Sequence, residues 1–118
     1  MSAAADPVLR ALAEPHRRTI LELVRDQPLP VGEIAAHVRD ITPQAVSQHL
    51  RVLRDAGLVE EQRDGTRHLF LVRTEGFEPV REFIESFWTT RLARLKRAAE
   101  ATHRREQTAK STRKRKRG

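Results

Sequence analysis

The sequence predicts a mainly α-helical fold with one β-hairpin, and three observations lead to this prediction. A helix with clear start and stop signals spans Thr42 to Gly57. A shorter helix, Val31 to Val38, precedes it across a tight connection, and an Asp64-Gly65 dipeptide between two apolar–polar runs follows it. Two short helices followed directly by a hairpin are the elements of a winged helix-turn-helix.

Length and composition limit the chain to one small, lean domain. It has 118 residues, of which 38% are hydrophobic, so a second copy would help it to bury apolar surface. Cysteine is absent, which excludes disulfides and thiolate chemistry. No apolar run reaches the length of a membrane span and no signal-peptide pattern opens the chain, so we expect a soluble cytoplasmic protein without a membrane partner.

The basic charge is concentrated at the end of the chain. Eight of the 23 Lys and Arg residues lie at 104–118 beside Glu106 alone, so residues 1–103 are neutral overall. We predict a domain over residues 1–105 and a basic disordered tail over residues 106–118, because no apolar residue there could hold the chain in place. The tail is either a solvated run or a non-specific tether to phosphates, and the density of cations favours the tether.

Two helices are expected before residue 30. Asp6 is placed to cap a short helix from Pro7, and Glu14-Pro15 then breaks the chain before a second helix that runs to Arg25. Arg17 and Arg18 lie near the start of this second helix, where they oppose the helix dipole. They either pair with carboxylates or meet an anion such as a phosphate, and the sequence does not favour one of these over the other.

The helix from Thr42 to Gly57 has an apolar face and a face suited to nucleic acid. Thr42 is the expected N-cap, with Pro43 at the first helical position and Gly57 as a left-handed C-cap. Amides and guanidinium groups pair with base edges and phosphates, which predicts insertion into a DNA major groove. The predicted contacts of this helix are Thr42, Gln44, Ser47, Gln48, His49, Arg51 and Arg54. For His49 a structural role and a phosphate contact stay equally open.

The hairpin that follows has a basic tip. A hairpin directly after a helix-turn-helix is a wing, and a basic tip suits the sugar–phosphate edge or the minor groove. The predicted contacts of the wing are Arg63, Thr66, Arg67 and His68.

The last helix, predicted from Glu78 to Arg105, carries an aromatic stripe. Such a stripe could cap the core of its own chain, but one this large favours a dimer interface, with the first helix beside it. The predicted interface comprises Val8, Leu9, Leu12, Val80, Phe83, Ile84, Phe87, Trp88, Leu92 and Leu95.

In the order of its elements the chain resembles the ArsR family of bacterial winged-helix repressors. The matching segments are ALAEPHRRTILELV (Ala11–Val24), PVGEIAAHV (Pro30–Val38), TPQAVSQHLRVLRDAGLV (Thr42–Val59) and RDGTRHLFLV (Arg63–Val72). The resemblance implies a homodimer joined through its first and last helices, which represses transcription until an effector loosens it from DNA. It also implies that Gln44, Ser47, Gln48 and Arg51 face double-stranded operator DNA; the effector is not identified by the sequence.

The sequence lacks the metal-binding motifs that the resemblance to the family would imply. Pro30-Val31-Gly32 stands where arsenic-sensing relatives have Cys-Val-Cys, and only His103-Arg104-Arg105-Glu106 matches part of the zinc set on the last helix. His16, His37, His68 and His103 lie on separate elements and suggest no shared ligand set, so we expect neither a metal nor a cofactor.

The sequence leaves two possible functions, a sequence-specific repressor and a module without operator specificity. No catalytic constellation can be assembled, so an enzyme is not expected. A dimeric, sequence-specific repressor is favoured by Gln44, Ser47 and Gln48, since binding without operator choice would need only cations. The alternative is an architectural or interaction module without operator specificity.

Overall fold

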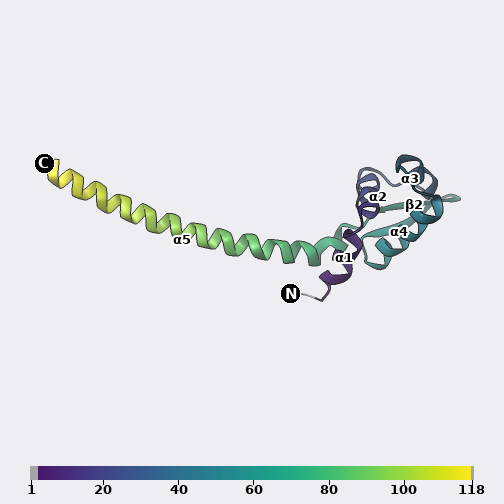
Figure 1. Cartoon of the computed structure of the whole chain (residues 1–118), viewed down its shortest axis with the longest axis horizontal. Coiled ribbons are helices and arrows are strands. Elements are labelled where there is room, and N and C mark those ends of the chain that lie inside the picture. Colours follow the sequence, from purple (N-terminus) through teal and green to yellow (C-terminus); the bar gives the residue numbers. More distant parts are fainter. Residues whose placement is uncertain (1–2, 118) are drawn as a thin grey trace. The chain divides into compact units, whose positions relative to one another are not determined.

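The computed structural model describes residues 3–117, with side chains up to Thr108. Its elements follow one another along the chain as Figure 1 shows. They are α1 (Ala5–Leu12), α2 (Pro15–Asp26), α3 (Val31–His37), α4 (Pro43–Asp55), β1 (Val59–Asp64), β2 (Arg67–Val72), the 3-10 helix η1 (Thr74–Phe77) and α5 (Glu78–Arg117). This is the predicted mainly helical fold with one hairpin.

The chain divides into two units, Met1–Phe83 and Ile84–Gly118. The first holds α1 to α4, the hairpin and the first residues of α5; the second consists of the remainder of α5. In the described part of the chain, none of the helices has a stretch both long and apolar enough to cross a bilayer.

The hydrophobic core lies in the first unit, where α2, α3 and α4 pack against the hairpin and α1 packs against α2 and α4. The most deeply buried large side chains come from α2, α3, α4 and the short connection between α4 and β1. They are Ile20, Val24, Ile34, Val46, Leu50, Leu53 and Leu58. Val46, Leu50 and Leu53 are the predicted apolar face of α4, and their burial fixes which face of that helix is left outward.

Helix α4 has the predicted signals at both ends. The Thr42 hydroxyl accepts a hydrogen bond from the Ala45 amide at 3.1 Å, and Pro43 is the first helical residue. Gly57 has φ 79°, where a side chain would be strained. Its amide donates to the Arg54 carbonyl at 2.9 Å and the Leu58 amide donates to the Leu53 carbonyl at 2.9 Å, which is the Schellman pattern of helix termination.

The wing is a two-stranded antiparallel hairpin whose register runs from Val59↔Val72 to Asp64↔Arg67. Gly65, with φ 64°, is the first of the two residues that join the strands, the position at which a type II′ turn needs glycine. At the inner end, the Leu29 amide donates to the Phe70 carbonyl at 3.0 Å and the Phe70 amide donates back at 2.8 Å. This bridge attaches the hairpin to the segment between α2 and α3.

The boundaries of three helices differ from the prediction. α1 begins at Ala5 after Ala4, without a side-chain cap, so Asp6 lies inside the helix and not at its N-cap. α3 ends at His37, one residue before the predicted end. α5 continues to Arg117, beyond the end predicted at Arg105 and through the segment expected to be disordered. After Pro79 the helix contains no glycine or proline and has many Ala, Lys, Arg, Glu and Gln residues, which have high helix propensity.

Arg17 and Arg18 have a role that neither sequence-based alternative described. Arg17 donates to the Ala11 carbonyl at 2.7 Å and to the Arg10 carbonyl at 3.2 Å, and Arg18 donates to the Leu12 carbonyl at 2.7 Å. These carbonyls belong to the last turn of α1, where a helix leaves carbonyls without i+4 partners, and the Arg10 carbonyl also accepts from the Ala13 amide at 3.3 Å. The two guanidinium groups therefore cap α1 from α2.

Candidate nucleic-acid interface

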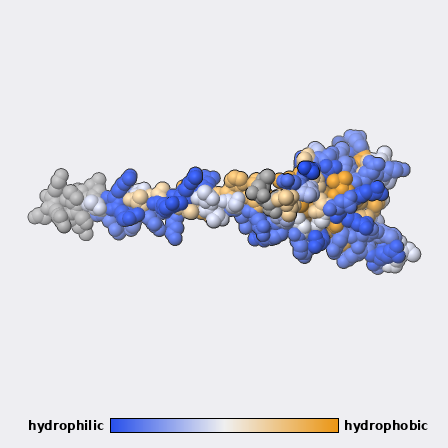
Figure 2. All heavy atoms as spheres, turned by 90° about the horizontal axis from the view of Figure 1, so that it is seen from below, coloured by the Kyte–Doolittle hydropathy of each residue, from blue (hydrophilic) through white to orange (hydrophobic). Residues whose placement is uncertain are grey.

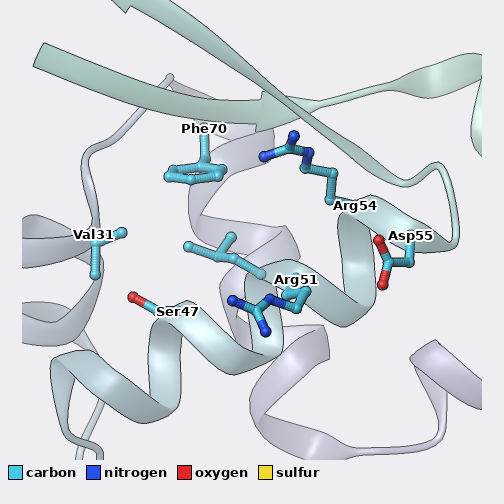
Figure 3. A pocket seen from close by; sticks show the side chains of 7 residues that line it. Val31, Ser47, Arg51, Arg54, Asp55 and Phe70 are labelled. Carbon is cyan, nitrogen blue, oxygen red and sulfur yellow. The ribbon is translucent and has the colours of Figure 1, made fainter.

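The outward face of α4 presents the predicted polar side chains to solvent. Its amides, hydroxyls and guanidinium groups are held on a rigid helix because the opposite face is fully buried. Ser47, Arg51 and Arg54 point outward from successive turns of the helix in Figure 3. The exposed members of the predicted set are Thr42, Gln44, Ser47, Gln48, Arg51 and Arg54.

A hollow separates this face from the wing. Arg51 and Arg54 rise into it from α4 and the Phe70 ring enters it from β2 (Figure 3). Phe70 is only half-buried, although it lies on the hairpin strand nearest the core. The helix wall of the hollow thus carries two guanidinium groups and the Asp55 carboxylate, and the hairpin wall is the apolar Phe70 ring.

Glu61 of the wing links its hairpin to α4. Its carboxylate accepts from the Arg54 guanidinium at 3.1 Å and also contacts His68 Nδ1. Two predicted DNA-contacting residues therefore share one acidic partner that the sequence analysis did not single out. In the hairpin register Glu61 is opposite Phe70, so its side chain lies on the same side of the wing as the ring that faces α4.

The tip of the wing has a second ion pair, with α3. The Arg67 guanidinium lies 3.1 Å from the Glu33 carboxylate, and both side chains are about half exposed, at 54% and 52%. Arg63 and Thr66, the other predicted residues of the tip, are exposed. The wing therefore keeps cationic side chains at its surface, where Arg67 pairs with Glu33 of α3, while Glu61 of the wing pairs with Arg54 of α4.

His49 turns away from the outward face of α4 and packs against the start of α2. Its side chain is 20% exposed, and its Nδ1 lies 3.8 Å from a Glu14 carboxylate oxygen and 3.5 Å from an Arg17 nitrogen. The rings of His16 and His49 are stacked, with centroids 5.8 Å apart and planes inclined by 29°. These contacts give His49 structural partners, which is the first of the two roles that the sequence left open.

No sequence pattern predicts the cluster of Glu14, His16 and His49. Glu14 caps α2 by accepting from the Arg17 amide at 2.9 Å, and its other carboxylate oxygen lies 3.1 Å from His16 Nδ1. The prediction that His16, His37, His68 and His103 form no shared ligand set did not include His49, which is the histidine that stacks on His16. Because 32 residues separate Arg17 from His49, only the packing of α4 on α2 brings the groups together.

The environment shifts two pKa values in the cluster. Burial lowers the pKa of the His49 imidazole, and the charges of Arg17 and His16 add to this effect against the opposing charge of Glu14. Burial alone would raise the pKa of the Glu14 carboxyl, but the Arg17 amide, the His16 hydrogen bond and the imidazole charges bring it below its ordinary value. The favoured state is a Glu14 carboxylate facing a neutral His49.

The predicted dimer residues fall into two groups. Val8 and Val80 are buried at 3% and 7% exposure and belong to the core of the first unit, whereas Leu12 and Phe83 are half-buried and Leu9 is 36% exposed. The apolar side chains farther along α5 are exposed by about half or more, and Figure 2 shows apolar residues on the surface of this helix. They are Ile84, Phe87, Trp88, Leu92 and Leu95.

Known proteins with similar sequences identify the family of this chain. A family model described as a helix-turn-helix domain matches residues 12–62. The chain is 39% identical over 87 residues to the HTH-type transcriptional regulator Rv2034 of Mycobacterium tuberculosis, covering 74% of this chain and 80% of the relative. It is 34% identical over 58 residues to the transcriptional repressor SdpR of Bacillus subtilis, covering 49% of this chain and 63% of the repressor.

A solved structure supports the same conclusion. The homodimeric winged helix-turn-helix DNA-binding domain of Mb0332 from Mycobacterium bovis, a possible ArsR-family transcriptional regulator, is 27% identical. It superposes with a TM-score of 0.58 over 73% of this chain and 79% of that chain. Sequence segments, architecture and relatives agree, and the chain belongs to the ArsR family of winged helix-turn-helix transcriptional regulators.

Proposed function

We propose that this chain is a homodimeric repressor that recognises double-stranded operator DNA in the cytoplasm through α4 and the wing. The observation that carries the proposal is the chemistry of the exposed face of α4. Gln44, Ser47 and Gln48 supply neutral donors and acceptors, and Arg51 and Arg54 supply charge on the same helix. A surface that only held the DNA backbone would need the cations alone.

The two kinds of side chain have separate roles in this proposal. Gln44 and Gln48 hydrogen-bond base edges in the major groove, where a glutamine amide pairs with both donor and acceptor of adenine. Arg51 and Arg54 bind phosphates or guanine at the border of the same groove. Arg63, Thr66, Arg67 and His68 bring the wing to the adjacent sugar–phosphate edge or minor groove.

Dimerisation through α1 and α5 supports recognition of a two-fold symmetric site. The exposed stripe from Ile84 to Leu95 supports this proposal, as does the homodimeric state of the Mycobacterium bovis domain. Two copies related by a two-fold axis present two α4 helices to successive major grooves, so the operator would be a palindrome. Repression follows if the bound dimer occupies a promoter, and the likeness to SdpR supports that direction of control.

The basic segment at residues 106–118 adds attraction without specificity in this account. Six of its residues are Lys or Arg, against Glu106 alone. Such a segment would raise affinity for any DNA by releasing counterions and would leave the choice of sequence to α4.

Competition in a gel shift tests the proposal. Labelled DNA from upstream of this protein's own coding sequence is bound and then challenged with the same DNA or with unrelated DNA of equal length. We expect at least a hundredfold excess of unrelated DNA to be needed for the same displacement, within the range typical of specific binding. Equal competition by both DNAs would favour the architectural alternative and contradict operator recognition.

A further inference from the structure

The cluster at the start of α2 holds three side chains that bind metals in other proteins. One ligand atom from each of Glu14, His16 and His49 can be chosen so that all three lie within 4.8 Å of one another. All three side chains are partly buried, with exposures of 31%, 44% and 20%. We propose that Glu14, His16 and His49 form a binding site for a divalent transition metal ion of the zinc class.

The distances fit such an ion after a small contraction. Zinc binds imidazole nitrogen and carboxylate oxygen at about 2.0–2.2 Å, which puts neighbouring ligands of a tetrahedral site about 3.3 Å apart. Glu14 Oε1 lies 3.1 Å from His16 Nδ1, and the other carboxylate oxygen, Oε2, lies 3.8 Å from His49 Nδ1. One ligand atom from each residue already lies within 4.8 Å of the other two, so rotation of the Glu14 carboxylate and the two rings would have to shorten these separations by at most about 1.5 Å.

The donor set selects the class of metal. Two imidazoles and one carboxylate suit zinc, cobalt and nickel, whereas magnesium and calcium prefer oxygen ligands alone. Binding requires neutral imidazole, and burial lowers the pKa of His49 in that direction. Three protein ligands leave the fourth position of a tetrahedral ion to water.

Arg17 limits the affinity of the site. Its Nη1 donates to His49 Nδ1 at 3.5 Å, a long hydrogen bond that the metal would have to replace. Its other bonds, 2.7 Å to the Ala11 carbonyl and 3.2 Å to the Arg10 carbonyl, can persist and keep the guanidinium in place. A cation so close repels the metal, so we expect an exchangeable site and not a permanent structural one.

The proposed metal site lies between α2 and α4. Glu14 and His16 belong to the start of α2, and His49 lies on α4 next to Gln48 of the exposed face. An ion bound by all three would fasten α4 to α2 directly behind the proposed DNA-contacting surface. The site differs from the two metal sites considered in the sequence, since it contains no thiol and no residue of the last helix.

Cobalt titration of the full-length protein tests the proposal without DNA, so its outcome is independent of the proposed function. A tetrahedral Co²⁺ ion absorbs visible light far more strongly than the hydrated ion. We expect absorption that saturates at one ion per chain and disappears when zinc is added. His16→Ala and Glu14→Gln should each weaken cobalt binding at least tenfold. Gln still offers an acceptor for the Arg17 amide, so the second variant keeps the cap of α2.

Two histidine variants serve as matched controls. His37→Ala removes an exposed imidazole from α3, and His103→Ala removes the one on α5 that matches part of the family's zinc set. Both should bind cobalt like the wild type, and circular dichroism should show the same helix content in all variants. Three results would overturn the proposal: no saturable absorption below millimolar cobalt, unchanged affinity in His16→Ala, or loss of binding in His103→Ala.

Discussion

Arg51 and Arg54 lie three residues apart on α4 but differ in their surroundings. Arg54 is paired with Glu61, which also contacts His68, so its charge is partly compensated before any DNA arrives. Exposed pairs of this kind contribute about 0–1 kcal/mol to stability. The position of Glu61 between helix and wing suggests that it orients Arg54 and His68 and does not stabilise the domain.

Replacing Glu61 by Gln should strengthen DNA binding without changing its specificity. The change leaves Arg54 and His68 without their carboxylate and removes a negative charge beside the DNA, so one more phosphate contact becomes available. We expect the slope of log affinity against log salt to steepen by up to about 0.9, for operator and random DNA alike.

Glu60→Gln is the matched control, because Glu60 precedes Glu61 on β1 and so points to the opposite side of the hairpin. Fluorescence anisotropy at several salt concentrations provides the slopes. If both variants steepen the slope equally, net charge and not the pairing with Arg54 explains the effect.

The elements show where sequence patterns suffice and where they do not. Thr42, Pro43 and Gly57 act within a few residues of their own position, so local signals identified both ends of α4 correctly. The Glu14–His16–His49 cluster depends on the packing of two helices that are distant in sequence, and no local pattern contains it. The end of α5 lies beyond the predicted Arg105, because a helix rich in Lys, Arg, Glu and Gln can continue without apolar residues that hold it against a core.

Gly76 shows a close approach between two connecting segments. It lies in η1, and a Cβ atom there would overlap the carbonyl oxygen of Gly57 and lie 2.6 Å from the Gly57 carbonyl carbon. The obstacle is backbone and not a flexible side chain, so it cannot rotate away. The connection between the wing and α5 thus rests directly on the glycine that ends α4.

Gly76→Ala should therefore destabilise the protein by about 1–3 kcal/mol, the usual cost of overpacking. Urea unfolding followed by circular dichroism measures the change in the free energy of unfolding. Gly32→Ala is the control, since a Cβ at that position in α3 meets nothing within 4 Å and should leave stability unchanged or slightly raised. Equal stability of the two variants would show that the segments are not in close contact in solution.

At the scale of the whole molecule, the apolar side chains of α5 are the largest exposed hydrophobic feature among the described residues. Phe87, Trp88 and Leu92 are each 60% exposed. Ile84, Trp88, Leu92 and Leu95 follow one another at intervals of three to four residues, and Phe87 lies three residues after Ile84, so the apolar side chains share one side of the helix. A surface of this kind is costly in water and is typical of an interface.

Changing Phe87 and Trp88 together to Glu should convert the dimer to a monomer. Four added carboxylates in the two-fold interface would repel one another and remove two large aromatic contacts from each chain. Sedimentation velocity measures the result. Ser86→Glu with Ala93→Glu adds the same charge on the opposite side of the helix and should leave the dimer intact. A stable dimer of the Phe87 and Trp88 variant would contradict the interface.

The central claim is that α4 recognises the DNA sequence, whereas the basic segment at residues 106–118 raises affinity for any DNA. Affinities for operator and random DNA, measured across a salt series, test this claim most directly. Gln44→Ala or Gln48→Ala should weaken operator binding by roughly 1–3 kcal/mol and leave binding to random DNA nearly unchanged. Removal of Lys110–Gly118 deletes six cations, of which only some bind phosphates at once, so the salt slope should fall by roughly 2–4. The ratio of operator to random affinity should then stay almost constant. If truncation collapses that ratio while the Gln44 and Gln48 variants preserve it, the basic segment reads the sequence and the account is wrong.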